Sequence, residues 1–300
     1  MGPTYEKLKE TGLLPVPEEA VLELLRVARA TGPDIPETVA IIERDLATAG
    51  RLIEYVNAPF AGQPRHVTSV SQGVSLLGAQ TSRNILLGFS LISRSTDDRC
   101  SSFDYKTYRS ETIIRAVLAR RLAQTFGGFA PDEVFAVGLL CRIGQFALCR
   151  IYPDTYAHLL MEADGREPSC LRKLEREALG IDQNELAAMM MAEWQLAPDY
   201  CAAVRHQDSL DDAMHKSDHG ELSRILRLSA LGAPVLASGS ITRASFTSLV
   251  KWANRLGIKP DRFAEIFNTT GREIPIFGSI IGLSIRQVPD LLELYARALR

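Results

Sequence analysis

The sequence predicts an all-α protein. Apolar residues recur three and four positions apart along most of the chain, whereas no run of alternating β-branched residues stands between turn signals. The 300 residues are 46% apolar and 23% charged, which is typical of a globular protein and excludes a disordered or fibrous chain. This length leaves room for two modest domains.

The first lobe is expected at residues 13–95. Leu13–Pro17 contains two prolines, which fix φ and favour an extended segment. A helix follows, with apolar residues on one face at Val21, Leu24, Leu25 and Ala28. After a break at Thr31–Asp34, a second apolar stripe predicts one continuous helix of about five turns from Val39 to Val56.

Two more helices complete this lobe. Ser69 or Ser71 caps a short helix that Gly78 ends, and another helix runs from about Thr81 to Ile92. The polar stretch Ser93–Ser102 marks the boundary with the second lobe, expected at residues 103–210.

The second lobe begins with a helix at Tyr105–Phe126, ended by two glycines. Pro131 marks the start of the next helix, and Val134–Leu148 is so apolar that it predicts one central buried helix, interrupted only by Arg142. Further helices are expected near 152–163, 169–178, 183–193 and 199–206, before a polar boundary at Ser209–Gly220.

Residues 221–300 are expected to form a helical extension, including helices at Thr247–Leu256 and Asp261–Asn268 and a last one ending at Tyr295–Arg300. This segment has 11 Lys/Arg and 6 Asp/Glu, net +5, in a chain of net charge −2. Arginines scattered over solvated helix faces explain that excess as simply as an acidic partner does. Arg224 and Arg227, with Lys251 and Arg255, form a basic set that has only Trp252 as an aromatic companion, which argues against nucleic-acid binding.

The cysteines and the apolar runs predict the cellular compartment of the protein. Five cysteines are an odd number without CxxC spacing, which predicts reduced thiols in a cytoplasmic protein. The charge-free apolar runs are little over half of the ~20 residues that a membrane span needs, and the N-terminus lacks the apolar region of a secretory signal. We therefore expect no membrane association.

Ordered pieces of the chain resemble the HD-related output (HDOD) domain of bacterial signalling proteins. The pieces span roughly residues 13–210: LLPVP (13–17), IIERDLATAGRLIEYVNAPF (41–60), TSVSQGVSLLG (68–78), AVLARRLA (116–123), VFAVGLLCRIGQFAL (134–148) and LGIDQNELAAMMMAEWQLAPDY (179–200). The resemblance implies an N-terminal helical lobe (13–95) packed on an HD-like lobe (103–210), here followed by the C-terminal extension (221–300). One departure is Leu46, where family members usually have proline.

The related HD phosphohydrolases hold metal ions with His and Asp side chains, which supply lone pairs that arginine and an amide nitrogen lack. By this resemblance, the corresponding positions here are Glu111, Cys141, Arg142 and Gln183, with His206 left of the terminal pair. Cys141 and His206 are too few for a metal site, and the fixed charge of Arg142 repels a cation. The resemblance therefore implies a degenerate site with no metal and no cofactor.

Two further predictions concern side-chain contacts. A buried Arg142 needs a counter-charge, and Glu111 on the preceding helix could pair with it; alternatively, Arg142 points to solvent. A small-molecule or peptide site is expected between the two lobes, lined by Asn57, His66 and Asn84, because pockets are common at such interfaces.

The resemblance implies a non-catalytic regulatory module that acts through protein–protein contacts. Its partner would be a signalling protein such as a cyclic-dinucleotide enzyme or a response regulator. The alternative is a metal-dependent phosphohydrolase that acts on a nucleotide or a cyclic dinucleotide. The extension either transmits a state to a partner or precedes an output domain, and the sequence leaves this, the ligand and the oligomeric state open.

Overall fold

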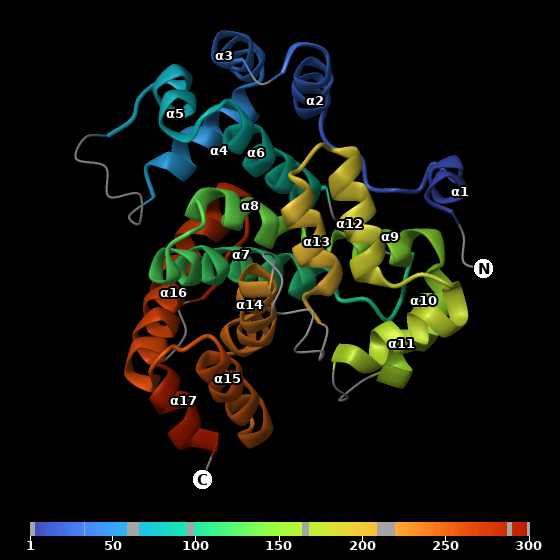
Figure 1. Ribbon diagram of the computed structural model, residues 1–300, viewed down its shortest axis with the longest axis vertical. Helices are drawn as coiled ribbons and strands as arrows, with labels where there is room; N and C mark the ends of the chain where they lie inside the picture. Colours follow the sequence, from blue (N-terminus) through green and yellow to red (C-terminus); the bar gives the residue numbers. More distant parts are fainter. Residues whose placement is uncertain are drawn as a thin grey trace.

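The computed structural model describes residues 4–32, 34–58, 66–94, 99–163, 168–208, 220–286 and 290–298, and none of these residues forms a strand. The predicted all-α fold is confirmed. Figure 1 shows the N-terminal helices at one end of the molecule, the later helices of the extension at the other, and the HD-like helices between them. Most of residues 209–220, the second predicted boundary, and part of the first lie outside the described residues.

The N-terminal lobe consists of α1 (Tyr5–Glu10), α2 (Glu19–Thr31), α3 (Ile35–Glu43), α4 (Leu46–Val56), α5 (Val70–Leu77) and α6 (Ala79–Ser93). Helices α2 to α5 contact the buried helix α6, whereas Lys9 of α1 reaches Glu193 of the second lobe. The prediction of one helix from Val39 to Val56 is wrong. The chain leaves helical geometry at Asp45 (φ −117°, ψ 107°), whose carboxylate accepts a hydrogen bond from the Thr48 amide at 2.6 Å and caps a new helix.

The HD-like lobe is built around the long helix α7. Its helices are α7 (Tyr105–Phe126), α8 (Pro131–Leu140), α9 (Ile143–Ile151), α10 (Pro153–Ala163), α11 (Pro168–Leu179), α12 (Gln183–Glu193) and α13 (Pro198–His206). The predicted central helix over Val134–Leu148 is therefore also wrong. It ends at Leu140 and restarts at Ile143, because Arg142 adopts a non-helical conformation (φ −114°, ψ 13°).

The C-terminal extension consists of α14 (Gly220–Ser238), α15 (Arg243–Arg255), α16 (Pro260–Ile280) and α17 (Leu291–Ala298). The prediction ended the α16 helix at Asn268, but the helix continues through Pro275 for three more turns. That second half is held by burial, since Ile274 and Phe277 are inaccessible to solvent.

The three segments share their apolar cores. In one core, the ring of Phe135 in α8 lies 4.9 Å from Tyr55 in α4, 5.9 Å from Phe89 in α6 and 5.3 Å from Phe277 in α16, measured between centroids. Helix α7 contacts α8, α14 and α16, as Figure 1 shows. Residues 131–151, which hold α8 and α9, include an 18-residue stretch that is long and apolar enough to cross a membrane, but 83% of that stretch is buried inside the protein.

Candidate functional site

Arg142 lies at the α8–α9 break with its guanidinium inside the protein. Nη1 donates a hydrogen bond to Gln183 Oε1 at 3.0 Å, and Nη2 lies 3.2 Å from Asp208 Oδ2. Burial by itself lowers the pKa of Arg142, but the charge of Asp208, with smaller effects of Cys141 and Glu175, raises that pKa overall. Arg142 is therefore a fixed cation at the centre of the site, and the solvent-facing alternative is wrong.

Asp208 is the counter-ion of two arginines. It follows α13, is 1% exposed, and also forms an ion pair with Arg227 of α14. The side-chain amide of Asn184 donates a hydrogen bond to Asp208 Oδ2 at 3.0 Å. Burial raises the pKa of Asp208, yet Arg142, Arg227 and the Asn184 amide together hold that pKa far below the ordinary range. We call Arg142, Gln183, Asn184, Asp208 and Arg227 the buried polar cluster.

Glu175 of α11 supports the cluster from behind Gln183. Its carboxylate accepts hydrogen bonds from the Tyr156 hydroxyl and, at 2.9 Å, from the backbone N–H of Gln183 at the start of α12. Burial is the main influence and raises the pKa of Glu175 to about 7, although these two hydrogen bonds oppose it. Glu175 thereby fixes the position from which Gln183 reaches Arg142.

The predicted pairing of Glu111 with Arg142 is wrong. Glu111 lies on α7 with 23% of its side chain exposed, and its carboxylate is 3.9 Å from Arg115, one turn further along the same helix. Burial raises the pKa of Glu111, while Arg115 and then Arg142 lower it to a lesser degree. The fully buried side chain of Asp208 takes the role of counter-ion to Arg142, which the partly exposed Glu111 of α7 does not.

The remaining predicted site residues differ in what they contribute. Cys141 is buried beside Arg142, and its thiol donates to the Gly138 carbonyl. Burial raises the pKa of Cys141, so it stays a thiol rather than the thiolate that a metal requires. His206 is the last residue of α13, and the next residue, Gln207, donates to the Cys141 carbonyl at 3.1 Å and to Asn184 Oδ1 at 3.2 Å.

The side chains at these positions do not suit a catalytic metal. Among the described residues, no group of three or more His, Cys, Asp or Glu side chains is arranged to hold one. The single negative charge of Asp208 is already shared by two guanidinium groups, and Gln183 offers an amide oxygen that accepts from Arg142. A divalent ion would have to displace two fixed cations, which Coulomb repulsion opposes.

Close backbone contact brings α9 and α12 together at the cluster. A Cβ atom on Gly144 would lie 2.0 Å from the Gln183 carbonyl oxygen and 2.8 Å from the Ala187 nitrogen. Only glycine fits at this crossing. The contact holds the start of α12 against the start of α9, so Gln183 lies within reach of Arg142.

The three residues predicted to line a pocket between the lobes make other contacts or face solvent. Asn57 holds the end of α4 to the Val67 backbone through two hydrogen bonds of 2.8 Å. Asn84 is 1% exposed and accepts from Arg83 at 3.1 Å, and His66 is exposed. A hollow between the lobes does exist beside Pro15, but none of these three residues lines it.

The basic set considered for nucleic acid is divided, since Lys251 is exposed while the three arginines make contacts within the protein. Arg227 is 3% exposed and bound to Asp208, and Arg224 donates to the Arg255 carbonyl at 3.2 Å. Arg255 itself lies over the Trp252 ring, 4.8 Å from its centroid. These side chains build contacts between α14 and α15.

Sequence reasoning missed Asp208, Asn184, Glu175 and Arg227 as members of one site. Asn184 follows Gln183, and Asp208 lies two residues after His206, and the sequence did single out Gln183 and His206. The available signal was the buried arginine itself, which requires a buried carboxylate. Nothing in the spacing indicated that the partner would also bind a residue of the extension.

Comparison with known proteins identifies the family. The HDOD domain model matches residues 14–210, about two thirds of the chain. The chain belongs to the HDOD domain family. The HDOD match thus covers every residue of the buried polar cluster except Arg227, which lies in the extension.

Solved structures share this fold. The MmoQ response regulator of Methylococcus capsulatus is 27% identical, with a TM-score of 0.52 over 84% of this chain and 97% of that chain. An HDOD domain protein of unknown function from Geobacter sulfurreducens is 14% identical, with a TM-score of 0.59 over 93% and 96% of the two chains. The latter likeness shows the fold alone.

This chain spans only about a third of the length of the curated relative that it matches. An uncharacterized protein of Treponema pallidum (strain Nichols) is 25% identical over 198 residues, which are 64% of this chain and 37% of that protein.

Proposed function

We propose that this HDOD protein is a non-catalytic signalling module of the bacterial cytoplasm, which regulates a partner through protein–protein contacts. The observation that carries the proposal is the position of Arg142, hydrogen-bonded to Gln183 and paired with Asp208 where a phosphohydrolase needs a cation. A guanidinium neither deprotonates in a protein nor donates a lone pair, so it neither activates water nor ligates a metal.

The buried polar cluster also suggests how a signal passes through the molecule. Asp208 binds Arg142 of the HD-like lobe and Arg227 of α14 at the same time. Because a buried charge without its partner costs several kcal/mol, a movement of α14 that separates Arg227 from Asp208 is opposed by about that amount. Binding of a partner that shifts the extension would therefore change the contacts of Asp208 in the buried polar cluster.

The MmoQ structure supports a signalling role, since that relative is described as a response regulator. We accordingly take the partner to be a response regulator or an enzyme of cyclic-dinucleotide metabolism. Membership of the HDOD family agrees with this class of partner.

Catalysis is tested by incubating the full chain with Mn²⁺ or Fe²⁺ and either bis(p-nitrophenyl) phosphate or a cyclic dinucleotide. We expect no product above the protein-free control, because the ligand positions are occupied by a guanidinium and its partners. Turnover that EDTA abolishes, and that is also lost in a Cys141→Ser variant, would support the phosphohydrolase alternative and overturn the proposal.

The signalling role is tested by affinity capture from the native host with identification by mass spectrometry. Leu292 in α17 is 66% exposed, so Leu292→Glu changes the surface of the extension without touching the core. The matched control is Leu46→Glu, at an 88% exposed leucine of the N-terminal lobe. We expect a signalling protein to be captured by the wild type and the control and reduced severalfold with Leu292→Glu. Capture of no signalling protein by the wild type would contradict the role.

A further inference from the structure

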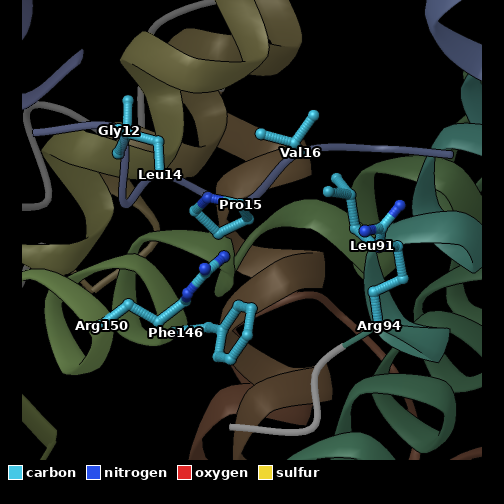
Figure 2. A pocket seen from close by; sticks show the side chains of 8 residues that line it. All are labelled: Gly12, Leu14, Pro15, Val16, Leu91, Arg94, Phe146 and Arg150. Atoms are coloured by element: carbon cyan, nitrogen blue, oxygen red, sulfur yellow. The ribbon is translucent and has the colours of Figure 1, made fainter. Parts of the chain in front are cut away.

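A pocket lies where the N-terminal segment crosses between α6 and α9. Its volume is about 230 Å³, and its walls include Leu14, Pro15, Leu91, Arg94, Phe146 and Arg150. Figure 2 shows Arg94 and Arg150 entering from opposite sides, with Pro15 on one wall and the Phe146 ring on another. The pocket is thus built from both lobes and is separate from the buried polar cluster.

Among the residues that the structure describes, the charged side chains that line this pocket are Arg94 and Arg150, and no described carboxylate lines it. Arg94 is exposed at the end of α6 and makes no ion pair with any residue in the described part of the chain. Two arginines converging on one small space favour an anion, because the planar fork of a guanidinium matches a carboxylate or a phosphate.

The walls of the pocket are held in place before any ligand arrives. Pro15 and Pro17 restrict the backbone of the crossing segment, and the Glu18 amide ties it to Ser90 Oγ of α6 at 2.6 Å. The Glu18 carboxylate is held in turn by Arg51 at 2.7 Å. The Arg150 guanidinium lies over the Phe146 ring, 5.8 Å from its centroid, which limits its movement.

We propose that this pocket binds a small organic anion, a carboxylate or phosphate carried on an apolar body. Arg94 and Arg150 would bind the anionic group, and the apolar side chains of Leu14, Leu91 and Phe146 would cover the rest. Pockets for drug-sized ligands measure about 300–1,000 Å³, so a volume below that range selects a compound nearer the size of phenyl phosphate than of a cyclic dinucleotide.

A larger pocket elsewhere lacks this preference. It measures about 500 Å³ between α7, α14 and residues 284–286, and its charged lining residues are Asp104, Lys106, Glu111 and Arg286. Two acids offset two bases there, and Asp104 already caps α7 through the Thr107 amide. Of these two pockets, the one beside Pro15 therefore has the charge that favours an anion.

The proposal is tested by calorimetric titration of the full chain at low ionic strength with phenyl phosphate, benzoate and inorganic phosphate. We expect saturable 1:1 binding of phenyl phosphate or benzoate, and the tighter of the two identifies the anionic group. Inorganic phosphate should bind at least about tenfold more weakly, since it cannot bury apolar surface. Equal affinity for inorganic phosphate, or no saturable binding of any probe, would overturn the proposal.

Substitutions locate the binding. Arg94→Gln should weaken binding about tenfold, as expected for loss of a hydrogen bond between charged groups, and should leave the melting temperature unchanged because Arg94 is exposed. The control Arg44→Gln removes an exposed arginine paired with Glu23 on the outer face of the same lobe and should bind normally. Equal weakening in both variants would show diffuse charge attraction and contradict the assigned site. These titrations need no partner or turnover, so their outcome is independent of the signalling role.

Discussion

At the scale of single residues, Asp208 and Glu175 show two opposite electrostatic ways of holding a buried carboxyl group. Asp208 stays ionised because two guanidinium groups surround it, whereas Glu175 has only neutral hydrogen-bond donors and is therefore easier to protonate. Breaking a buried pair such as Arg142–Asp208 costs about 3–5 kcal/mol, which makes the cluster intolerant of single substitutions.

Glu175 makes the stability of the protein depend on pH. Its pKa is about 7 in the folded protein, against an ordinary value of 4.5, so the folded state binds the proton more tightly than the unfolded state. The resulting stability is fully present below about pH 4.5 and is lost as pH rises through 7. We expect Glu175→Gln to remove this loss, so that wild type and variant differ by up to about 3 kcal/mol in their change of unfolding free energy between pH 4.5 and 8.

Urea unfolding at a series of pH values measures this difference. Glu177→Gln on the same helix is the matched control, because its side chain is 61% exposed and pairs only loosely with Lys173. Parallel stability curves for wild type and Glu175→Gln would contradict the assignment.

At the scale of helices, one interruption and one crossing place the site. The α8–α9 break turns Arg142 out of the helical pattern, and the Gly144 contact sets the spacing of α9 against α12. Both features depend on backbone geometry rather than on apolar periodicity. This is why the 134–148 stripe predicted a single helix.

We expect Gly144→Ala to destabilise the protein by more than about 2 kcal/mol, since the added methyl group would overlap the Gln183 carbonyl and force the helices apart. Gly50→Ala in α4 is the control. A Cβ there meets nothing within 4 Å, so the higher helix propensity of alanine should stabilise the protein by up to about 1 kcal/mol. Denaturant midpoints measure both changes, and similar values for the two variants would refute the close-contact argument.

At the scale of the whole molecule, the C-terminal extension is part of the same packing as the two lobes. Phe277 of α16 packs against Phe135 with its ring tilted by 39°, and Arg121 of α7 donates to Glu273 at 2.9 Å. An extension that completes another segment's core has no separate core of its own to unfold around.

The two tryptophans test this cooperativity. Trp194 lies at the end of α12 in the HD-like lobe, and Trp252 lies in α15 of the extension. In the single-tryptophan variants Trp252→Phe and Trp194→Phe, we expect the fluorescence midpoint in urea to match the midpoint from circular dichroism of the same variant. A Trp252 signal that changes at lower urea than the helical signal would show that the extension unfolds independently.

Local sequence was enough to predict the helical class, most helix positions and the family to which the chain belongs. These follow from local periodicity, caps and ordered motifs, which each involve residues close in the chain. Only the tertiary structure decided that Arg142 pairs with Asp208 rather than Glu111, and that Arg227 joins them from the extension. The choice of partner depends on which carboxylate is buried within reach after distant helices pack, and helical spacing carries no information about that.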